Sequence, residues 1–164
     1  MSAARSAQAA PSTELGGDAS LLLDDQLCFA LYAASRAVTG RYRPLLEVLG
    51  LTYPQYLVML VLWEHGSERD GVPVKELGAS LHLDYGTLTP LLKRLEANGL
   101  LKRERRADDE RVVVVSPTGE GLALRERART VPAAIGDAMG LAPDETQEAM
   151  RLLRRLTVNV TGTG

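Results

Sequence analysis

The spacing of apolar residues changes at Asn98-Gly99 from a helical to a strand period, and this change constrains the fold more than any other feature. Before it, four leucines recur at i, i+3, i+4 and i+7, the spacing of one buried helix face: Leu88, Leu91, Leu92 and Leu95. After it, residues 100–105 and 111–115 have the character of two strands, joined by a polar turn at residues 106–110. The sequence therefore predicts a helix over residues 85–97, ended by Asn98-Gly99, and then a β-hairpin.

A shorter helix precedes this one, and the connection between them is tight. Val74, Leu77 and Leu81 share one face, which predicts a helix over residues 74–81. Asp84 is suited to cap the next helix, because its carboxylate can accept the free N–H groups of the first turn. Two short helices joined by a tight turn and followed directly by a hairpin form the winged helix-turn-helix pattern.

Upstream of this unit, the chain is predicted to be helical after a disordered tail. Residues 1–19 are rich in small residues and have no helical period, and their lack of an apolar run argues against a signal peptide. Ser20 then opens a helix that ends at Gly40, and a short helical turn follows as far as Gly50. Thr52-Tyr53-Pro54-Gln55 is a capping box that starts the next helix.

Downstream of the hairpin, two further helices are expected. Ser116-Pro117 opens one, which breaks at Pro132, and Pro143 starts the last helix, which runs to about Val158. The predicted fold class is therefore mainly α with a small β-wing, arranged as a winged helix-turn-helix.

The charge of the chain is distributed unevenly. The 164 residues carry a net charge of −2, which taken alone argues against a nucleic-acid partner. The first 25 residues contribute −3, however, whereas residues 84–106 carry +3. A hydrophobic content of 45% is enough for a packed core, and no apolar run approaches the ~18 residues of a membrane span. The positive charge is therefore concentrated on the predicted helix-turn-helix and hairpin.

The predicted 85–97 helix carries nucleic-acid-binding groups on the face opposite its leucines. Threonine hydroxyls and methyls there can reach base edges, and the cations suit phosphates or guanine. Gly86 lets the backbone approach DNA closely, whereas Pro90 bends the helix near its first turns. The candidate DNA-binding residues of this region are Asp84, Tyr85, Gly86, Thr87, Thr89, Pro90, Lys93 and Arg94.

The hairpin adds further candidate DNA-binding residues, namely Arg105, Asp109 and Arg111, beside the cations Lys102, Arg103 and Arg106. An arginine at the tip of such a wing can enter the narrow minor groove, and Asp109 can pair with the Arg111 guanidinium to orient it. The alternative is that the charges only protect the edge of a hairpin from aggregation. The two preceding helices favour nucleic-acid binding.

Cys28 is the only cysteine in the chain, so it can form neither an internal disulfide nor a zinc site, and a reducing, cytoplasmic location is expected. Tyr32 lies four residues on and shares its helix face. A nearby helix N-terminus favours the thiolate, whereas Asp24 and Asp25 disfavour it, and the residues alone leave this balance open. A lone cysteine on an apolar helix can also be an inert small hydrophobe.

Four stretches of the chain resemble the MarR family of winged-helix repressors and, within it, the organic-hydroperoxide sensors of the single-cysteine OhrR type. They are Asp25-Gln26-Leu27-Cys28-Phe29-Ala30-Leu31-Tyr32-Ala33-Ala34-Ser35-Arg36, Thr52-Tyr53-Pro54-Gln55-Tyr56-Leu57-Val58-Met59-Leu60, Gly86-Thr87-Leu88-Thr89-Pro90-Leu91-Leu92-Lys93-Arg94 and Asp109-Glu110-Arg111. The first two are specific to the hydroperoxide sensors, and the last is shared by most of the MarR family.

This resemblance implies one MarR-type domain at residues 20–160. Its dimerisation helices would lie at about 20–50 and 117–160, and its DNA-binding part at about 52–116. The reduced homodimer would bind a pseudo-palindromic double-stranded operator, and an organic hydroperoxide would release it by oxidising the thiol. By motif position, Cys28 would be the sensing thiol, Tyr42 and Tyr53 would come from the partner subunit to hydrogen-bond its sulfur, and Tyr32 would line the same pocket.

A single cysteine limits what oxidation can produce. A sulfenic acid on Cys28 must persist, capture a low-molecular-weight thiol, cyclise with a backbone nitrogen or over-oxidise, because the only other cysteine of a homodimer is the equivalent Cys28. No cofactor or metal is expected, because His65 and His82 have no ligand residues at metal-binding spacing.

Three other functions are compatible with parts of the pattern. A small aromatic or anionic ligand could release a MarR-type repressor in which Cys28 is incidental. A thiol peroxidase would need a means of regenerating its thiol, and the chain has neither a second cysteine nor a Cys–His pair. A helical dimerisation protein without DNA binding would leave the basic hairpin unexplained.

Overall fold

The computed structural model describes residues 20–65 and 71–162, and the predicted tail at residues 1–19 lies outside them. The chain divides after Ser35 into two compact units, residues 1–35 and 36–164. In the first, the short 3-10 helix η1 (Leu23–Asp25) is followed by the start of helix α1 (Leu27–Glu47).

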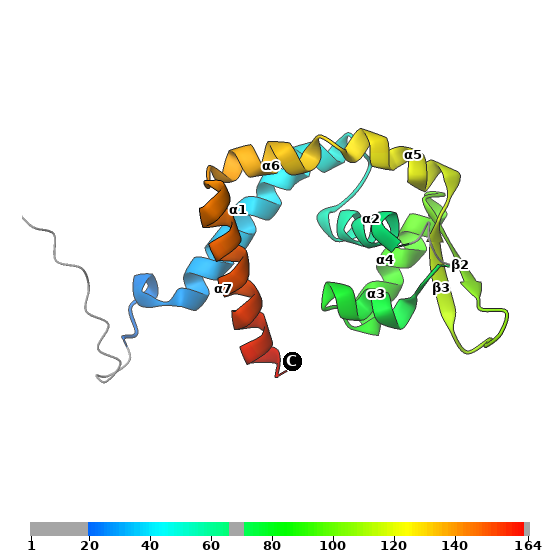
Figure 1. Ribbon diagram of the computed structural model, residues 1–164, viewed down its shortest axis with the longest axis horizontal. Coiled ribbons are helices and arrows are strands. Elements are labelled where there is room, and N and C mark those ends of the chain that lie inside the picture. Colours follow the sequence, from blue (N-terminus) through cyan, green and yellow to red (C-terminus); the bar gives the residue numbers. More distant parts are fainter. Residues whose placement is uncertain (1–19, 66–70, 163–164) are drawn as a thin grey trace, which may run out of the picture. The chain divides into compact units, whose positions relative to one another are not determined.

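The second unit contains the rest of α1 and a small sheet among helices, as Figure 1 shows. Its elements are α2 (Tyr53–His65), β1 (Val72–Pro73), α3 (Val74–Leu81), α4 (Tyr85–Ala97), β2 (Leu101–Arg105), β3 (Val113–Pro117), α5 (Gly119–Ala128), α6 (Val131–Met139) and α7 (Pro143–Thr161). The predicted fold class, mainly helical with a β-wing, is confirmed. None of the described helices is both long and apolar enough to cross a membrane.

The helix-turn-helix formed by α3 and α4 has the predicted bounds, because local signals set both ends of α4. The Asp84 side chain caps its start, and Gly99 follows its end with a φ of 71°, in the left-handed region that favours glycine. His82 takes a left-handed conformation between the two helices, with a φ of 53°. The turn between α3 and α4 therefore depends on the left-handed backbone conformation of His82.

The leucine face of α4 is buried as expected, and it packs into one core with α2, α3 and the sheet. Leu88, Leu92 and Leu95 are each at most 2% exposed, and Leu91 is half-buried. Fully buried neighbours come from the other elements: Val58, Met59, Leu62, Leu77, Leu101 and Val115. Because this face is held inside, the opposite face of α4 is held toward solvent.

The wing is a three-stranded antiparallel sheet in the order β1-β3-β2. In the hairpin, Leu101 pairs with Pro117 and Arg105 with Val113, and on the other side β1 pairs Val72 with Val115. Two residues are too few to show an alternating pattern, so β1 was not predicted from the sequence. It ties the start of α3 to the wing.

The predicted break at Gly40 is wrong, because α1 continues through Gly40 and Pro44 to Glu47. A predicted helix start at Ser20 is also wrong, since α1 begins at Leu27 after η1. Glycine and proline inside a helix both cost stability, and Pro44 removes the hydrogen bond to the Gly40 carbonyl. Burial of Leu46 and packing of nearby side chains against the core outweigh that cost.

The wing turn is longer than predicted, and the second strand lies two residues later in the chain. Residues 106–112 form the turn, so Arg111 lies in the turn and not in a strand. Ser116-Pro117 belongs to β3 and does not open a helix; Thr118 caps α5 instead, its hydroxyl accepting the Gly121 N–H at 3.1 Å. Pro117 is tolerated because it lies past the end of β1, so one side of β3 is an edge there.

Three helices follow the wing where two were expected. The break falls before Val131, and Pro132 lies in the first turn of α6, where its missing N–H costs nothing. Gly140 ends α6, and Pro143 starts α7 as predicted.

Candidate nucleic-acid interface and redox thiol

The start of α4 is organised by the carboxylate of Asp84. One of its oxygens accepts the Thr87 backbone N–H at 2.8 Å, and the other accepts the Thr87 hydroxyl at 2.7 Å. These bonds, the hydroxyl first, hold the pKa of Asp84 below its ordinary value of 3.8. Asp84 therefore caps α4, and both of its carboxylate oxygens already accept hydrogen bonds from Thr87.

The two threonines on the outward face of α4 both donate their hydroxyl protons within the helix. The Thr89 hydroxyl donates to the Tyr85 carbonyl at 2.7 Å, just as that of Thr87 donates to Asp84. Each hydroxyl therefore offers lone pairs to a ligand, and a lone pair suits an amino group on a base edge better than a phosphate oxygen.

The remaining predicted residues of α4 also lie on its exposed side. Lys93, Arg94 and Pro90 are exposed, and Tyr85 is 71% exposed despite its large apolar ring. Pro90 lacks the N–H that would bond to the Gly86 carbonyl, so the helix carries one missing bond near its start. The structure thus brings the sequence-predicted residues of α4 onto one face.

At the wing, Arg105 and Asp109 stabilise the turn. The Arg105 guanidinium donates to the Glu110 carbonyl at 2.7 Å, and the Asp109 carboxylate accepts the backbone N–H of Arg111 at 3.1 Å. The predicted contact between Asp109 and the Arg111 guanidinium is not found among the described residues. Asp109 instead shapes the backbone that carries Arg111, whose side chain is exposed.

Glu96 is a functional candidate that sequence reasoning missed. Its carboxylate accepts Nε of Arg103 at 3.0 Å and the Arg103 backbone N–H at 3.2 Å. Hydrogen bonds from Arg103 hold the pKa of Glu96 below its ordinary value. The pair joins the last turn of α4 to β2 and so sets the wing against the recognition helix. Seven residues and a change of element separate the partners, so no helical or strand period could have indicated the contact.

Cys28 lies in the first turn of α1 and is exposed. The Gln26 carbonyl accepts the first helical hydrogen bonds, from Phe29 at 3.0 Å and Ala30 at 3.2 Å. Cys28 is therefore at the second helical position, where backbone N–H groups point outward and favour a negative charge. Tyr32 lies one turn on and is 57% exposed. The predicted start of the helix was seven residues too early, but the cysteine is still close to an N-terminus.

In the second unit, Tyr42 and Tyr53 lie together, with ring centroids 4.6 Å apart. Tyr56, which was not predicted as a site residue, is buried, and its ring centroid lies 5.8 Å from that of Tyr42. Burial, followed by the two neighbouring phenols, raises the pKa of Tyr42, and burial likewise raises that of Tyr56. Tyr42 and Tyr56 therefore keep their protons at neutral pH and can act as hydrogen-bond donors. The proposed role of Tyr42 and Tyr53 toward sulfur stays a prediction.

Neither histidine belongs to a metal site in the part of the chain that the structure describes, where no group of three or more candidate ligands occurs. His65 lies 3.6 Å from Glu64, next to it in the chain, and His82 is exposed in the turn before α4. The candidate functional groups are therefore a basic helix face, a wing and a group of phenols in the second unit, and a thiol in the first.

Comparison with known proteins assigns the family. A family model described as transcriptional regulator SarA/Rot matches residues 41–126. The organic hydroperoxide resistance transcriptional regulator of Bacillus subtilis (strain 168) is 47% identical over 130 residues, which cover 79% of this chain and 84% of that relative. The chain belongs to the MarR-like winged-helix transcriptional regulators.

Solved structures from this family share the fold. Reduced AbfR bound to DNA is 36% identical with a TM-score of 0.70, and the match covers 85% of this chain and 94% of that one. Overoxidised AbfR bound to DNA is 37% identical with a TM-score of 0.67, covering 84% and 94%. The curated relative is named for transcriptional regulation, and the two structures show a family member on DNA in two oxidation states.

Proposed function

We propose that this protein is a homodimeric transcriptional repressor that binds a pseudo-palindromic operator in its reduced form and releases it when an organic hydroperoxide oxidises Cys28. The observation that carries the proposal is the presence, in one chain, of a basic recognition helix with its wing and of a single exposed thiol in the first turn of a helix. The 47% identity to a regulator named for organic hydroperoxide resistance supports the choice of signal.

DNA binding rests on the exposed face of α4 and on the wing. Lys93 and Arg94 supply cations beside the Thr87 and Thr89 hydroxyls, and Arg111 lies in the wing turn. A helix of this kind enters the major groove while a wing arginine reaches the minor groove. AbfR, bound to DNA in its solved structures, shares this fold.

The redox step needs only the thiolate and the hydroperoxide. The Cys28 sulfur attacks the terminal oxygen of R–O–O–H, so that an S–O bond forms and the O–O bond breaks, giving the sulfenic acid. The leaving alkoxide takes up a proton and departs as the alcohol; sulfur loses two electrons and the peroxide gains them. In the dimer, the phenol hydroxyls of Tyr42 and Tyr53 of the partner subunit donate hydrogen bonds to the sulfur, and Tyr32 lines the site.

The dimer is supported by the exposure of α7. None of its residues is buried within the chain, although it carries large apolar side chains that are each 40% to 78% exposed: Met150, Leu152, Leu153, Val158 and Val160. A monomer rarely exposes such an apolar face along a whole helix, and a second copy of the same helix would cover it.

Cys28 acts as a stoichiometric sensor and not as the nucleophile of a catalytic cycle. One cysteine leaves no resolving partner within the chain, so each protomer consumes one hydroperoxide and then stays oxidised until a small thiol reduces it. A reducing, cytoplasmic compartment suits a free exposed thiol of this kind.

Fluorescence anisotropy on the operator upstream of the protein's own gene tests the proposal. Wild-type protein is expected to bind this DNA and to release it after one equivalent of cumene hydroperoxide per thiol, with the mass of each protomer rising by one oxygen. The Cys28→Ser variant is expected to bind equally well and to stay bound.

Release of the Cys28→Ser variant by the peroxide would overturn the thiol switch. Release of both proteins by an aromatic carboxylate, with no response to peroxide, would instead assign the protein to the ligand-controlled members of the fold. Catalytic consumption of peroxide without added thiol would indicate an enzyme.

A further inference from the structure

The structure separates the cations of α3, α4 and the wing into two groups. Four of them contact acids or a carbonyl of the chain: Lys102, Arg103, Arg105 and Arg106. For the other four, no ion pair or side-chain hydrogen bond is found among the described residues: Lys75, Lys93, Arg94 and Arg111. Only three of these four are sequence-predicted DNA contacts, and the fourth, Lys75, lies in the first turn of α3.

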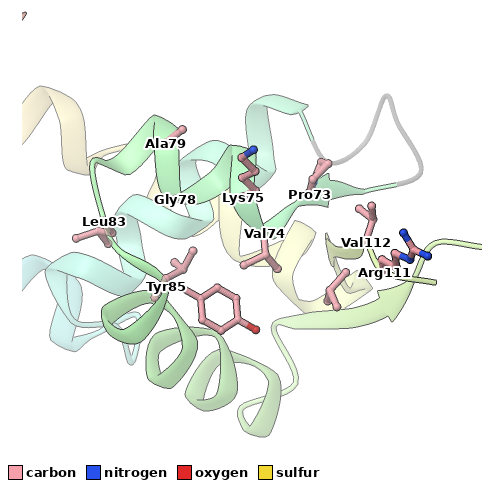
Figure 2. A pocket seen from close by; sticks show the side chains of 11 residues that line it. Pro73, Val74, Lys75, Gly78, Ala79, Leu83, Tyr85, Arg111 and Val112 are labelled. Carbon is pink, nitrogen blue, oxygen red and sulfur yellow. The ribbon is translucent and has the colours of Figure 1, made fainter. Parts of the chain in front are cut away.

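Lys75 and Arg111 lie around the same cleft as the exposed ring of Tyr85 (Figure 2). The cleft has a volume of about 410 Å³ and is formed by α3, the start of α4 and the wing. Its floor is apolar, with Val74 and Leu88 buried beneath it, and none of the described residues that line it is acidic. Two cationic residues and a tyrosine thus line a recess whose walls are largely apolar.

Such a recess attracts anions more strongly than an open surface with the same charges, because low-dielectric walls concentrate the field. Phosphate oxygens are the groups that lysine, arginine and tyrosine side chains most often contact on DNA. We propose that this cleft holds a phosphate of the DNA backbone, with Lys75 as its ammonium contact beside Tyr85 and Arg111. The inference rests on the proposed function and adds α3 to the DNA-binding surface.

A matched pair of variants tests the inference. Lys75→Gln and Lys102→Gln remove the same charge from the same part of the molecule, but Lys102 already lies 2.7 Å from Glu104 and outside the cleft. Operator affinity is measured by anisotropy from low to high salt, because each phosphate contact contributes about −0.9 to the slope of log K against log salt concentration. Lys75→Gln is expected to flatten that slope by about 0.9 per protomer, and Lys102→Gln by much less. Thermal unfolding of both variants checks that folding is unchanged.

Equal slopes for the two variants would overturn the inference while leaving operator binding intact. Displacement of the operator by inorganic phosphate at constant ionic strength, from wild type and not from Lys75→Gln, would assign the cleft to a free anion and also overturn it. If wild-type protein binds no DNA at all, the proposed function fails together with this inference.

Discussion

At the scale of single residues, hydrogen bonds within the chain occupy the hydroxyl protons of Thr87 and Thr89 on α4, so these protons are not available to DNA. The Asp84 carboxylate accepts a hydrogen bond from the Thr87 hydroxyl, and the Tyr85 carbonyl accepts one from the Thr89 hydroxyl. Both hydroxyls are left as acceptors, which suits the amino groups of adenine or cytosine. The same carboxylate caps the helix, so helix stability and the proposed base readout depend on one group.

The Asp84 cap makes the stability of the protein dependent on pH in a defined direction. Its folded pKa lies below the ordinary 3.8, so the cap stabilises the native state above that value, and this stabilisation is lost as the pH falls through the lower folded pKa. Asp84→Ala is therefore expected to lower the melting temperature at neutral pH, by an amount that shrinks on acidification.

Calorimetry across the acid range measures this difference. Asp137→Ala on α6 is the matched control, because the described residues give that carboxylate no hydrogen bond, and it should leave the melting temperature nearly constant. A deficit in Asp84→Ala that stays the same at every pH would contradict the assignment of the cap.

At the scale of elements, two contacts hold the wing and its neighbours. Glu96 and Arg103 join the end of α4 to β2, and the backbone of α5 approaches the chain just before β2 at Gly121. A Cβ on Gly121 would clash with the Leu100 carbonyl oxygen, and the Gly121 carbonyl accepts the Trp63 indole N–H at 2.8 Å. Gly121 is therefore the point at which α2, α5 and the wing meet.

Gly121→Ala is expected to destabilise the fold by about 1–3 kcal/mol, because a backbone shift is needed to accommodate the methyl group. Gly119→Ala in the same turn is the control, since a Cβ there meets nothing within 4 Å. Urea unfolding should place the two midpoints well apart, with Gly119→Ala at or above wild type. Similar midpoints would show that α5 is not held at Gly121.

At the scale of the whole molecule, charge and apolar surface are separated between regions. The chain carries −2 overall, yet four cations for which no ion pair or side-chain hydrogen bond is found among the described residues lie on α3, α4 and the wing: Lys75, Lys93, Arg94 and Arg111. Large apolar side chains are exposed along α7, which begins with Pro143 and buries none of its residues. One surface suits a polyanion and the other a second protomer, so binding of DNA and of the partner subunit need not compete.

Leu153→Glu is expected to weaken dimerisation at least tenfold and operator binding with it, because the side chain is 48% exposed in the protomer and would be buried in the dimer. Asn159→Glu adds the same charge to α7 at an exposed polar position and should leave the dimer intact. Sedimentation velocity measures both. A Leu153→Glu protein that stays dimeric would place the interface elsewhere.

Local signals predicted the helix-turn-helix accurately. The Asp84 cap, the leucine period and Asn98-Gly99 act within a few residues of one another, and α3 and α4 begin and end where those signals lie. The same reasoning failed at Gly40, because the helix there is maintained by burial against residues distant in sequence. It also failed at Ser116-Pro117, where pairing with β2 competes with a helix start.

The sequence by itself determined the helix-turn-helix, the hairpin after it and the single cysteine that restricts the products of oxidation, because each depends on residue type and short-range spacing. Only the tertiary structure decided which cations are available to DNA. That property depends on which acids lie beside them: Glu96 occupies Arg103 from another element, whereas Lys75 and Arg111 line one cleft where no described lining residue is acidic. Ion pairing is set by distance in space, and distance in space is what a linear pattern does not contain.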